Sequence, residues 1–147
     1  MRGSVTGILF SPLFAGMILS SCARYDLDRA DTEANRRGFE QHFGFVPPGS
    51  VTGVYYYADE LGIDVSYQLS FKCQRATVER IIRDLSLRPV PPGRAERLLD
   101  PRADLPWWQP GAIDGRDLWI REEEQHYYRQ LWYSERDQMA FYLEYSV

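Results

Sequence analysis

The sequence predicts an α+β fold, a two-layer sandwich in which one main helix packs on a single antiparallel sheet of about five strands. Residues 63–73 alternate apolar and polar side chains, residues 78–85 repeat apolar side chains at helical spacing, and residues 117–147 hold three further strand-like runs. Strands grouped before and after a single helix, in the order ββαβββ, favour an antiparallel sheet with the helix on its apolar face.

The first two strands are expected at 51–58 and 63–73, joined by a turn at 59–62. The second has the cleanest pattern in the chain: its apolar positions are Ile63, Val65, Tyr67, Leu69, Phe71 and Cys73, and its polar positions are Asp64, Ser66, Gln68, Ser70 and Lys72. Such alternation is typical of a strand with one buried face and one face in water. We therefore expect Leu69 and Phe71 to be buried and Gln68 to face solvent.

An amphipathic helix is expected after the second strand, because apolar residues recur at i, i+3, i+4 and i+7, namely Val78, Ile81, Ile82 and Leu85. Pro89 marks its end. Residues 89–116 are rich in proline and glycine, which predicts a long irregular connection. Three strands, at 117–121, 126–133 and 139–147, complete the domain.

The N-terminal residues have the three parts of a secretory signal. Arg2 supplies the positive charge, residues 5–19 are apolar or small and uncharged, and two serines precede Cys22. The apolar part is too short for a membrane span, which takes about 20 residues. Leu19-Ser20-Ser21-Cys22 resembles the lipobox of bacterial lipoproteins. The alternative is an ordinary cleaved signal peptide with a chance cysteine.

The lipobox resemblance implies that residues 1–21 are removed and that Cys22 carries acyl chains such as palmitate. The mature protein would then be anchored in the cell envelope, facing the periplasm. Ala23 and Arg24 follow the cysteine; because the aspartate that retains enteric lipoproteins in the inner membrane is absent, the outer membrane is favoured. Residues 22–38 are polar and are expected to form the lipidated N-terminus and a tether or loose helix, followed by a single domain over 39–147.

Charge and cysteine content exclude some partners and bonds. The chain has 21 acidic residues against 17 Lys and Arg, a net charge of −4, which argues against a nucleic-acid partner. If Cys22 is acylated, the only other cysteine, Cys73, has no intrachain disulfide partner. Cys73 ends the apolar face of the 63–73 strand, where we expect a small buried hydrophobe and not a nucleophile.

Motifs for catalysis or metal binding are not found, so no metal and no cofactor is expected. His42 and His126 are the only histidines, and neither belongs to a pattern such as HExxH. Carboxylates occur at Glu122-Glu123-Glu124, Asp114 and Asp117. Consecutive glutamates at a hairpin are typical of a solvated turn, although a pair at suitable spacing would suit a glycosidase.

Candidate binding residues lie in two places. Trp107 and Trp108 are flanked by prolines and form either a platform for a sugar ring or a partner protein, or a loop that folds back and closes the core. In the C-terminal strands, Arg129 and Trp132 fall on opposite faces, and either face could dock a partner. The candidate binding surface is therefore Trp107, Trp108, Arg129 and Trp132.

The succession of a Phe-rich start, a hairpin, one helix, a Trp-Trp-x-Pro loop and a C-terminal meander resembles small bacterial envelope proteins. We expect a non-catalytic cell-envelope lipoprotein, joined to the membrane by lipid on Cys22, that binds a protein or a cell-wall glycan. The alternatives are a small periplasmic hydrolase that uses carboxylates near the Trp-Trp loop, such as Asp104 or Asp114, and a lipid-anchored inhibitor or immunity protein.

Overall fold

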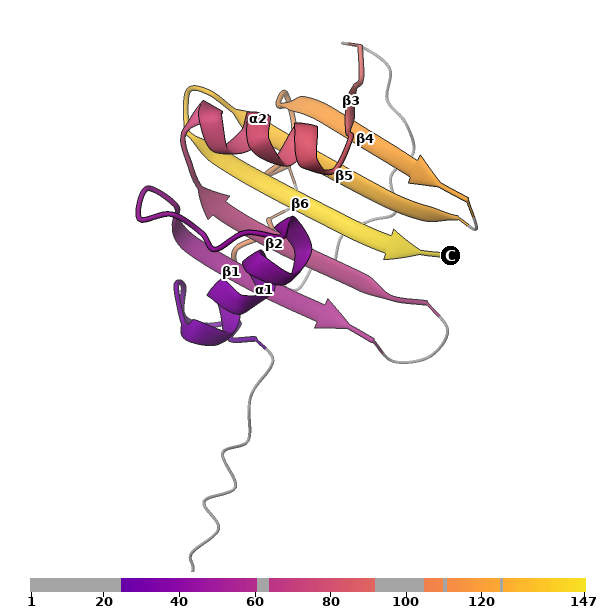
Figure 1. Cartoon of the computed structure of the whole chain (residues 1–147). Coiled ribbons are helices and arrows are strands. Elements are labelled where there is room, and N and C mark those ends of the chain that lie inside the picture. Colours follow the sequence, from indigo (N-terminus) through magenta and orange to yellow (C-terminus); the bar gives the residue numbers. More distant parts are fainter. Residues whose placement is uncertain (1–24, 61–63, 92–104, 110, 125) are drawn as a thin grey trace, which may run out of the picture.

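The computed structural model describes residues 25–60, 64–91, 105–109, 111–124 and 126–147. These residues form an α+β fold with two helices on one face of a six-stranded antiparallel sheet, whose strand order is β1-β2-β6-β5-β4-β3 (Figure 1). The elements are α1 (Glu33–Phe43), β1 (Thr52–Asp59), β2 (Ser66–Lys72), α2 (Arg75–Asp84), β3 (Arg88–Pro89), β4 (Asp117–Glu123), β5 (Tyr127–Ser134) and β6 (Met139–Ser146).

The predicted fold class is confirmed, with one helix and one strand more than the sequence indicated. The added strand, β3, pairs with β4 through only two residues, with Pro89 opposite Trp119. The amide of Val90 donates to the carbonyl oxygen of Leu118 at 2.9 Å. Hydrogen-bonded and non-bonded pairs alternate in an antiparallel ladder, so Pro89 occupies a non-bonded position where its missing N–H is not needed.

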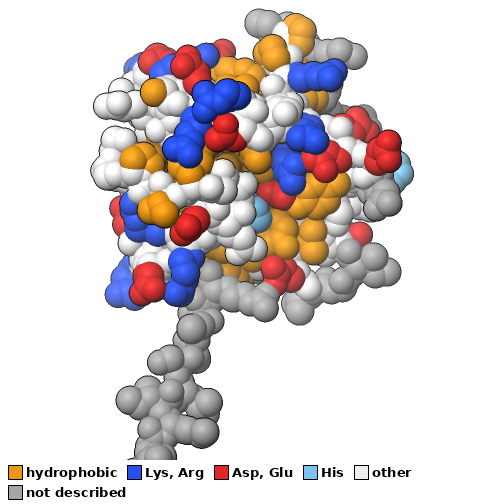
Figure 2. All heavy atoms as spheres, in the orientation of Figure 1, with side chains coloured by type: hydrophobic (Ala, Val, Ile, Leu, Met, Phe, Trp, Pro, Cys, Tyr) orange, Lys and Arg blue, Asp and Glu red, His pale blue; other side chains and the backbone are white. Residues whose placement is uncertain are grey.

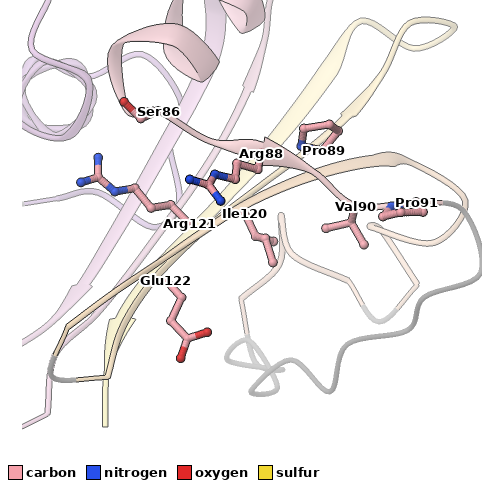
Figure 3. Close-up of a pocket in the computed structure, with 8 residues that line it drawn as sticks. All are labelled: Ser86, Arg88, Pro89, Val90, Pro91, Ile120, Arg121 and Glu122. Atoms are coloured by element: carbon pink, nitrogen blue, oxygen red, sulfur yellow. The ribbon is translucent and has the colours of Figure 1, made fainter.

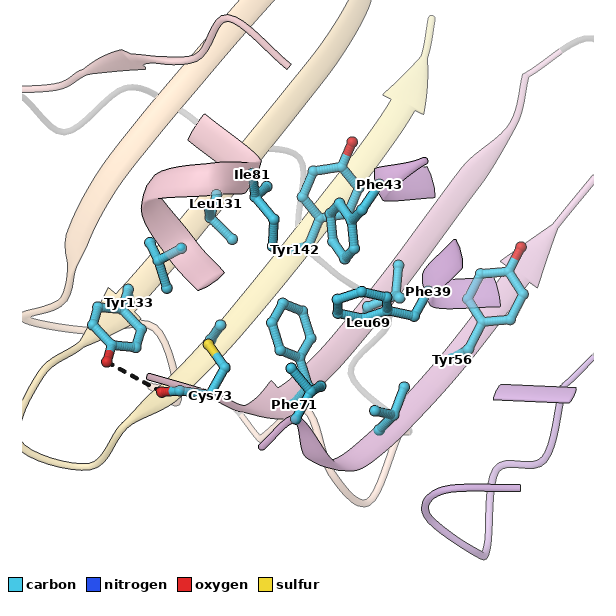
Figure 4. Packing of buried hydrophobic residues seen from close by; sticks show 14 of the residues in the cluster. Phe39, Phe43, Tyr56, Leu69, Phe71, Cys73, Ile81, Leu131, Tyr133 and Tyr142 are labelled. Atoms are coloured by element: carbon cyan, nitrogen blue, oxygen red, sulfur yellow. Dashed lines mark hydrogen bonds between the residues drawn. The ribbon is translucent and has the colours of Figure 1, made fainter. Parts of the chain in front are cut away.

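The core on the helix face is built from aromatic and aliphatic side chains of both helices and the sheet (Figure 4). Its residues include Phe39, Phe43, Leu69, Phe71, Val78, Ile81, Leu131 and Tyr142, each at most 3% exposed. Cys73 lies among them, 2% exposed, as the sequence predicted. The Tyr133 hydroxyl donates to the carbonyl oxygen of Cys73 at 3.2 Å, which joins β5 to the end of β2.

The second face of the sheet is also covered, which corrects the expectation that Gln68 faces solvent. Gln68 is 1% exposed and Ser70 is fully buried. An aromatic cluster lies on this face and takes in Trp108 and Leu105 of the connection before β4, together with Tyr57, Trp132, Phe141, Leu143 and Tyr145. The strand alternates as predicted, but two of its polar side chains, those of Gln68 and Ser70, are buried on the covered second face, whereas Lys72 is exposed.

In its described part, which begins at Tyr25, the segment over residues 22–38 that was expected to be a tether or a loose helix packs on the sheet. The polar segment forms α1, which starts with the Thr32 hydroxyl accepting from the Asn35 amide. The Asn35 side chain is fully buried; its amide nitrogen donates to the carbonyl oxygens of Asp26 and Arg29, both at 2.9 Å, and its oxygen accepts from the Asp26 amide at 2.7 Å. These hydrogen bonds, together with the packing of Tyr25 and Leu27 on the core, attach the segment, and its polar composition did not reveal it.

Gly38 allows α1 to approach the sheet, and this gives a first prediction. A Cβ at Gly38 would lie 2.3 Å from a ring carbon of Tyr56, a core residue that is 3% exposed. At a solvent-exposed helix position, Gly→Ala raises the free energy of unfolding by about 1 kcal/mol. Here Gly38→Ala should instead lower the free energy of unfolding by about 1–3 kcal/mol, because the core must move.

Urea denaturation measures the change. Glu40→Ala is the matched control, because Glu40 is exposed on the same helix, and it should stay within about 0.5 kcal/mol of wild type. A more stable Gly38→Ala protein would contradict the close packing of α1 on Tyr56.

Candidate functional site

A polar cluster lies on the helix face of the sheet, where the last turn of α1 meets the end of β6. We call it the Glu144 cluster. It consists of Glu144 and Tyr142 of β6, His42 of α1, and Tyr127 and Arg129 of β5. Alternation along β6 places Ala140, Tyr142 and Glu144 on one face. The first two belong to the apolar core, so Glu144 continues that core with a charge.

Glu144 is surrounded by donors. Its Oε2 lies 2.8 Å from His42 Nδ1 and accepts from the Tyr142 hydroxyl at 2.7 Å. Its Oε1 accepts from the Tyr127 hydroxyl, and Arg129 Nε lies 3.5 Å from it. The carboxylate is therefore satisfied on both oxygens, as a buried charge must be.

His42 is engaged on both ring nitrogens. Its Nε2 lies 3.1 Å from the Tyr56 hydroxyl, and its ring centroid is 4.6 Å from that of Tyr67. The His42 and Glu144 side chains are 5% and 6% exposed. Glu144, His42 and Tyr56 thus form a continuous hydrogen-bonded chain from β6 through α1 to β1.

The environment shifts the pKa values of the cluster. Burial alone would raise the pKa of Glu144, but hydrogen bonds from His42, Tyr127 and Tyr142 and the charge of His42 lower it to about 2. Burial and the neighbouring carboxylate raise the pKa of Tyr142 and of Tyr127. The cluster is built around an ionised Glu144 and protonated tyrosines.

A carboxylate–imidazole–phenol chain is a geometry that can move protons, but here its members are enclosed. Tyr56 is 3% exposed and Tyr142 is fully buried, so a reactant could not reach either phenol without displacing the core. Burial also raises the pKa of Cys73 to about 12, which leaves a poor nucleophile. The arrangement fastens α1 to β6 and holds no free general base.

The rim of the cluster is charged and partly exposed. Glu123 contacts Arg129 through one of its carboxylate oxygens and lies 3.2 Å from Arg121 Nε. Figure 2 shows basic and acidic side chains close together on the helix face, with hydrophobic side chains visible between them.

The structure separates the four residues of the predicted binding surface. Trp108 and Trp132 are 2% and 3% exposed and pack edge to face at 6.0 Å on the second face. Trp107 is half-buried and stacks on Tyr55 at 5.5 Å. Arg129 lies on the opposite face, in the Glu144 cluster. The Trp-Trp loop therefore closes the core, the second of the two interpretations, and Trp108 and Trp132 present no platform in this conformation.

The predicted carboxylates do not converge either. Glu122 and Glu123 lie in β4 on opposite faces, Glu124 follows, and Asp114 is exposed in a turn; Asp104 lies outside the described residues. Over the described part of the chain, no three potential metal ligands come together. The described helices include none that is long and apolar enough to span a bilayer, and Cys22 lies outside the described residues.

An open groove lies at the edge of the sheet, where β3 and β4 diverge (Figure 3). We call it the β3–β4 groove. Its volume is about 460 Å³, and it is lined by Ser86, Arg88, Pro89, Val90, Pro91, Ile120, Arg121 and Glu122. Four of these residues are apolar, three are charged and one is a serine, so the lining is mixed.

Sequence analysis missed both the groove and the Glu144 cluster. One signal in the sequence pointed to the cluster. Glu144 falls on the same strand face as Ala140 and Tyr142, and a charge on a buried strand face needs a partner. That partner, His42, lies 102 residues earlier in the chain. No family model, curated protein sequence or solved structure matches the chain.

Replacing the buried charge gives the second prediction. Glu144→Gln should lower the free energy of unfolding by about 3 kcal/mol at pH 7, because His42 and Arg129 lose their buried carboxylate. The folded-state pKa of Glu144, about 2, is below its ordinary value of 4.5. Its stabilising effect is therefore complete above about pH 4.5 and is lost as the pH falls towards 2.

Thermal unfolding of both proteins across this pH range tests the prediction. The gap in melting temperature should be widest above pH 4.5 and should close in acid. Glu124→Gln is the control, since Glu124 is exposed, and it should not differ from wild type. A gap that is constant with pH would mean that Glu144 is not ionised in the folded protein.

The third prediction concerns the Trp-Trp loop. Trp108→Ala should destabilise the fold by about 3–5 kcal/mol, because it removes a buried indole that packs on Trp132 and Phe141. Trp107→Ala, in the same loop but half-exposed, should cost less. Denaturant titration compares the two, and equal unfolding midpoints for Trp108→Ala and wild type would show that the loop does not close the core.

Proposed function

We propose that this protein is a non-catalytic cell-envelope lipoprotein, anchored by lipid on Cys22, that binds a protein or a cell-wall glycan. The observation that carries the binding role is the contrast between the Glu144 cluster and the β3–β4 groove. The side chains best suited to acid–base chemistry, His42 and Glu144, are buried and bind each other. The groove is open, and both apolar and charged residues line it, among them the exposed Arg88.

The envelope location rests on the lipobox resemblance at Leu19–Cys22. The first described residues already belong to the folded domain, since the ring of Tyr25 packs edge to face on Tyr57 with centroids 5.3 Å apart. Under this proposal the chain between Cys22 and Tyr25 is short, so the domain sits close to the membrane. The outer membrane is favoured over the inner, as the residues after Cys22 indicate.

Lipid attachment is tested by metabolic labelling, which is the fourth prediction. Cells that express the full chain should incorporate labelled palmitate into the wild-type protein and into Cys73→Ala, but not into Cys22→Ala. Cys73→Ala is the matched control because the chain has two cysteines. Labelling of Cys22→Ala would contradict lipid attachment at Cys22.

The binding role is tested by cross-linking in cells, followed by purification of the lipidated protein in detergent. An envelope protein or glycan should be retained by the wild type in a fixed ratio. Turnover of a cell-wall substrate that is lost in Asp114→Asn, with the fold intact, would instead support the hydrolase interpretation and contradict a non-catalytic role.

A further inference from the structure

We propose that the domain stands edge-on on its membrane, with the β1 edge of the sheet on the headgroups of zwitterionic phospholipids and the β3–β4 groove at the far edge. Arg29 and Glu33 are the side chains that contact lipid. This proposal rests on the proposed lipid anchor at Cys22 and specifies the surface that meets the membrane. Three features carry it: where the chain enters the fold, how far that point is from Cys22, and which charges surround it.

The described chain enters the fold at an outer edge of the sheet. β1 is an edge strand, and β3 forms the opposite edge. The Tyr25 ring lies 6.2 Å from that of Tyr56 and 5.3 Å from that of Tyr57, which are neighbours in β1. Tyr25 packs against the aromatic clusters of both faces, so it lies across the edge itself. In Figure 1 the N-terminal segment and β1 are on the side of the sheet away from β3.

Hydrogen bonds hold this entry point to the domain. The buried Asn35 side chain bonds to both the amide and the carbonyl oxygen of Asp26. The Asp26 carboxylate accepts from the Arg29 amide at 3.0 Å. Farther along, the Asp31 amide donates to the carbonyl oxygen of Val54 in β1 at 2.9 Å. The segment therefore moves together with α1 and β1.

The chain between the lipid and this entry point is short. Cys22 and Tyr25 are three positions apart, so their Cα atoms are at most about 11 Å apart in a fully extended chain. Acyl chains on Cys22 would hold that residue at the boundary between hydrocarbon and headgroups. The headgroup layer of one leaflet is about 5–7 Å thick. Tyr25 is then at most a few ångströms above the headgroups, and the β1 edge touches them.

A domain that rested on either face of the sheet would not satisfy this tether. The helices on one face are about 10 Å across. The segment with Leu105 and Trp108 covers the other face, and layers packed on a sheet lie about 10 Å from it. Either arrangement would lift the sheet, and Tyr25 with it, too far from the headgroups. The edge-on arrangement keeps Tyr25 within reach.

The same arrangement turns the groove away from the lipid. Five spacings of about 4.8 Å separate β1 from β3 in the strand order, about 24 Å in all. Arg88 and Glu122, which line the groove, are therefore beyond the headgroup layer. A partner can approach the groove without contacting the membrane.

The exposed charges near the entry point form pairs of opposite sign. Arg29 lies 3.1 Å from Asp26, and Glu33 lies 2.9 Å from Arg37. Figure 2 shows such acidic and basic side chains side by side at the lower edge of the view, where Figure 1 places α1 and β1. A guanidinium can bind a headgroup phosphate, and a carboxylate can bind its ammonium group. Anionic lipids are instead recognised by clusters of about four to eight Lys or Arg, so this surface fits zwitterionic lipid.

The fifth prediction tests the arrangement with the lipidated full chain, Cys73→Ala, in nanodiscs of phosphatidylethanolamine and phosphatidylcholine that include headgroup-nitroxide lipid. A fluorophore is attached to single cysteines at five exposed positions: Arg29, Glu33, Arg83, Arg88 and Gln109. Quenching should be several-fold stronger at Arg29→Cys and Glu33→Cys than at the other three, because the nitroxide acts at close range. The three controls report the outer side of α2, the far edge and the second face.

Three results would contradict the proposal. Equal quenching at all five positions would show that the domain has no fixed orientation. Stronger quenching at Arg83→Cys or Gln109→Cys than at Arg29→Cys would show that it lies on a face. A pattern that appears only after phosphatidylglycerol is added would show that anionic lipid is required.

Failure of the orientation is distinguishable from failure of the anchor. Gel filtration shows whether the protein stays with the nanodiscs, and Cys22→Ala is the control that should elute without them. If the wild type also elutes without them, the anchor fails and the orientation with it. If it stays and the five positions are quenched alike, the anchor stands and the edge-on orientation is wrong.

Discussion

The structure depends on the central strand β6, which is buried on both faces. Each residue from Ala140 to Tyr145 is at most 6% exposed. A strand in that position needs two covering layers, and the chain supplies them differently. The helices cover one face, and the segment containing Leu105 and Trp108 covers the other. Removing either layer would expose aromatic area of the same strand, so the two layers stabilise one another through β6.

A charged residue on such a buried strand needs polar partners within hydrogen-bonding distance, and Glu144 has them. Its partners come from α1, β5 and β6 itself. His42 also forms a hydrogen bond with Tyr56 of β1 through its second ring nitrogen. A buried ion pair is weak evidence for added stability, because desolvation offsets much of the attraction. Such a pair requires its donors and acceptors at defined distances, however, and we infer that the cluster fixes the position of α1 on the sheet.

The limits of sequence analysis follow from the same arrangement. Alternation in β2 and the helical spacing of Val78 to Leu85 were readable because each pattern depends on near neighbours in the chain. That Gln68 is buried depends on the Trp108 loop, and the fit of Gly38 depends on Tyr56. Asn35 anchors residues 25–32 through its amide, in a segment whose composition resembles a linker. Contacts between segments far apart in the chain produce no periodic pattern in the sequence.

The β4 edge of the sheet is less enclosed than its interior. In the interior, Glu144 and His42 are committed to each other, and the tryptophans that the sequence singled out are packed against the sheet. β3 pairs with β4 at Trp119 and Ile120, and Val90 continues the pairing to Leu118, with a proline at the position that needs no donor. Natural sheets usually shield their edges against unwanted pairing. At this edge a short strand covers part of β4, and the uncovered end carries Glu122, Glu123 and Glu124, so backbone pairing and charge together shield the edge.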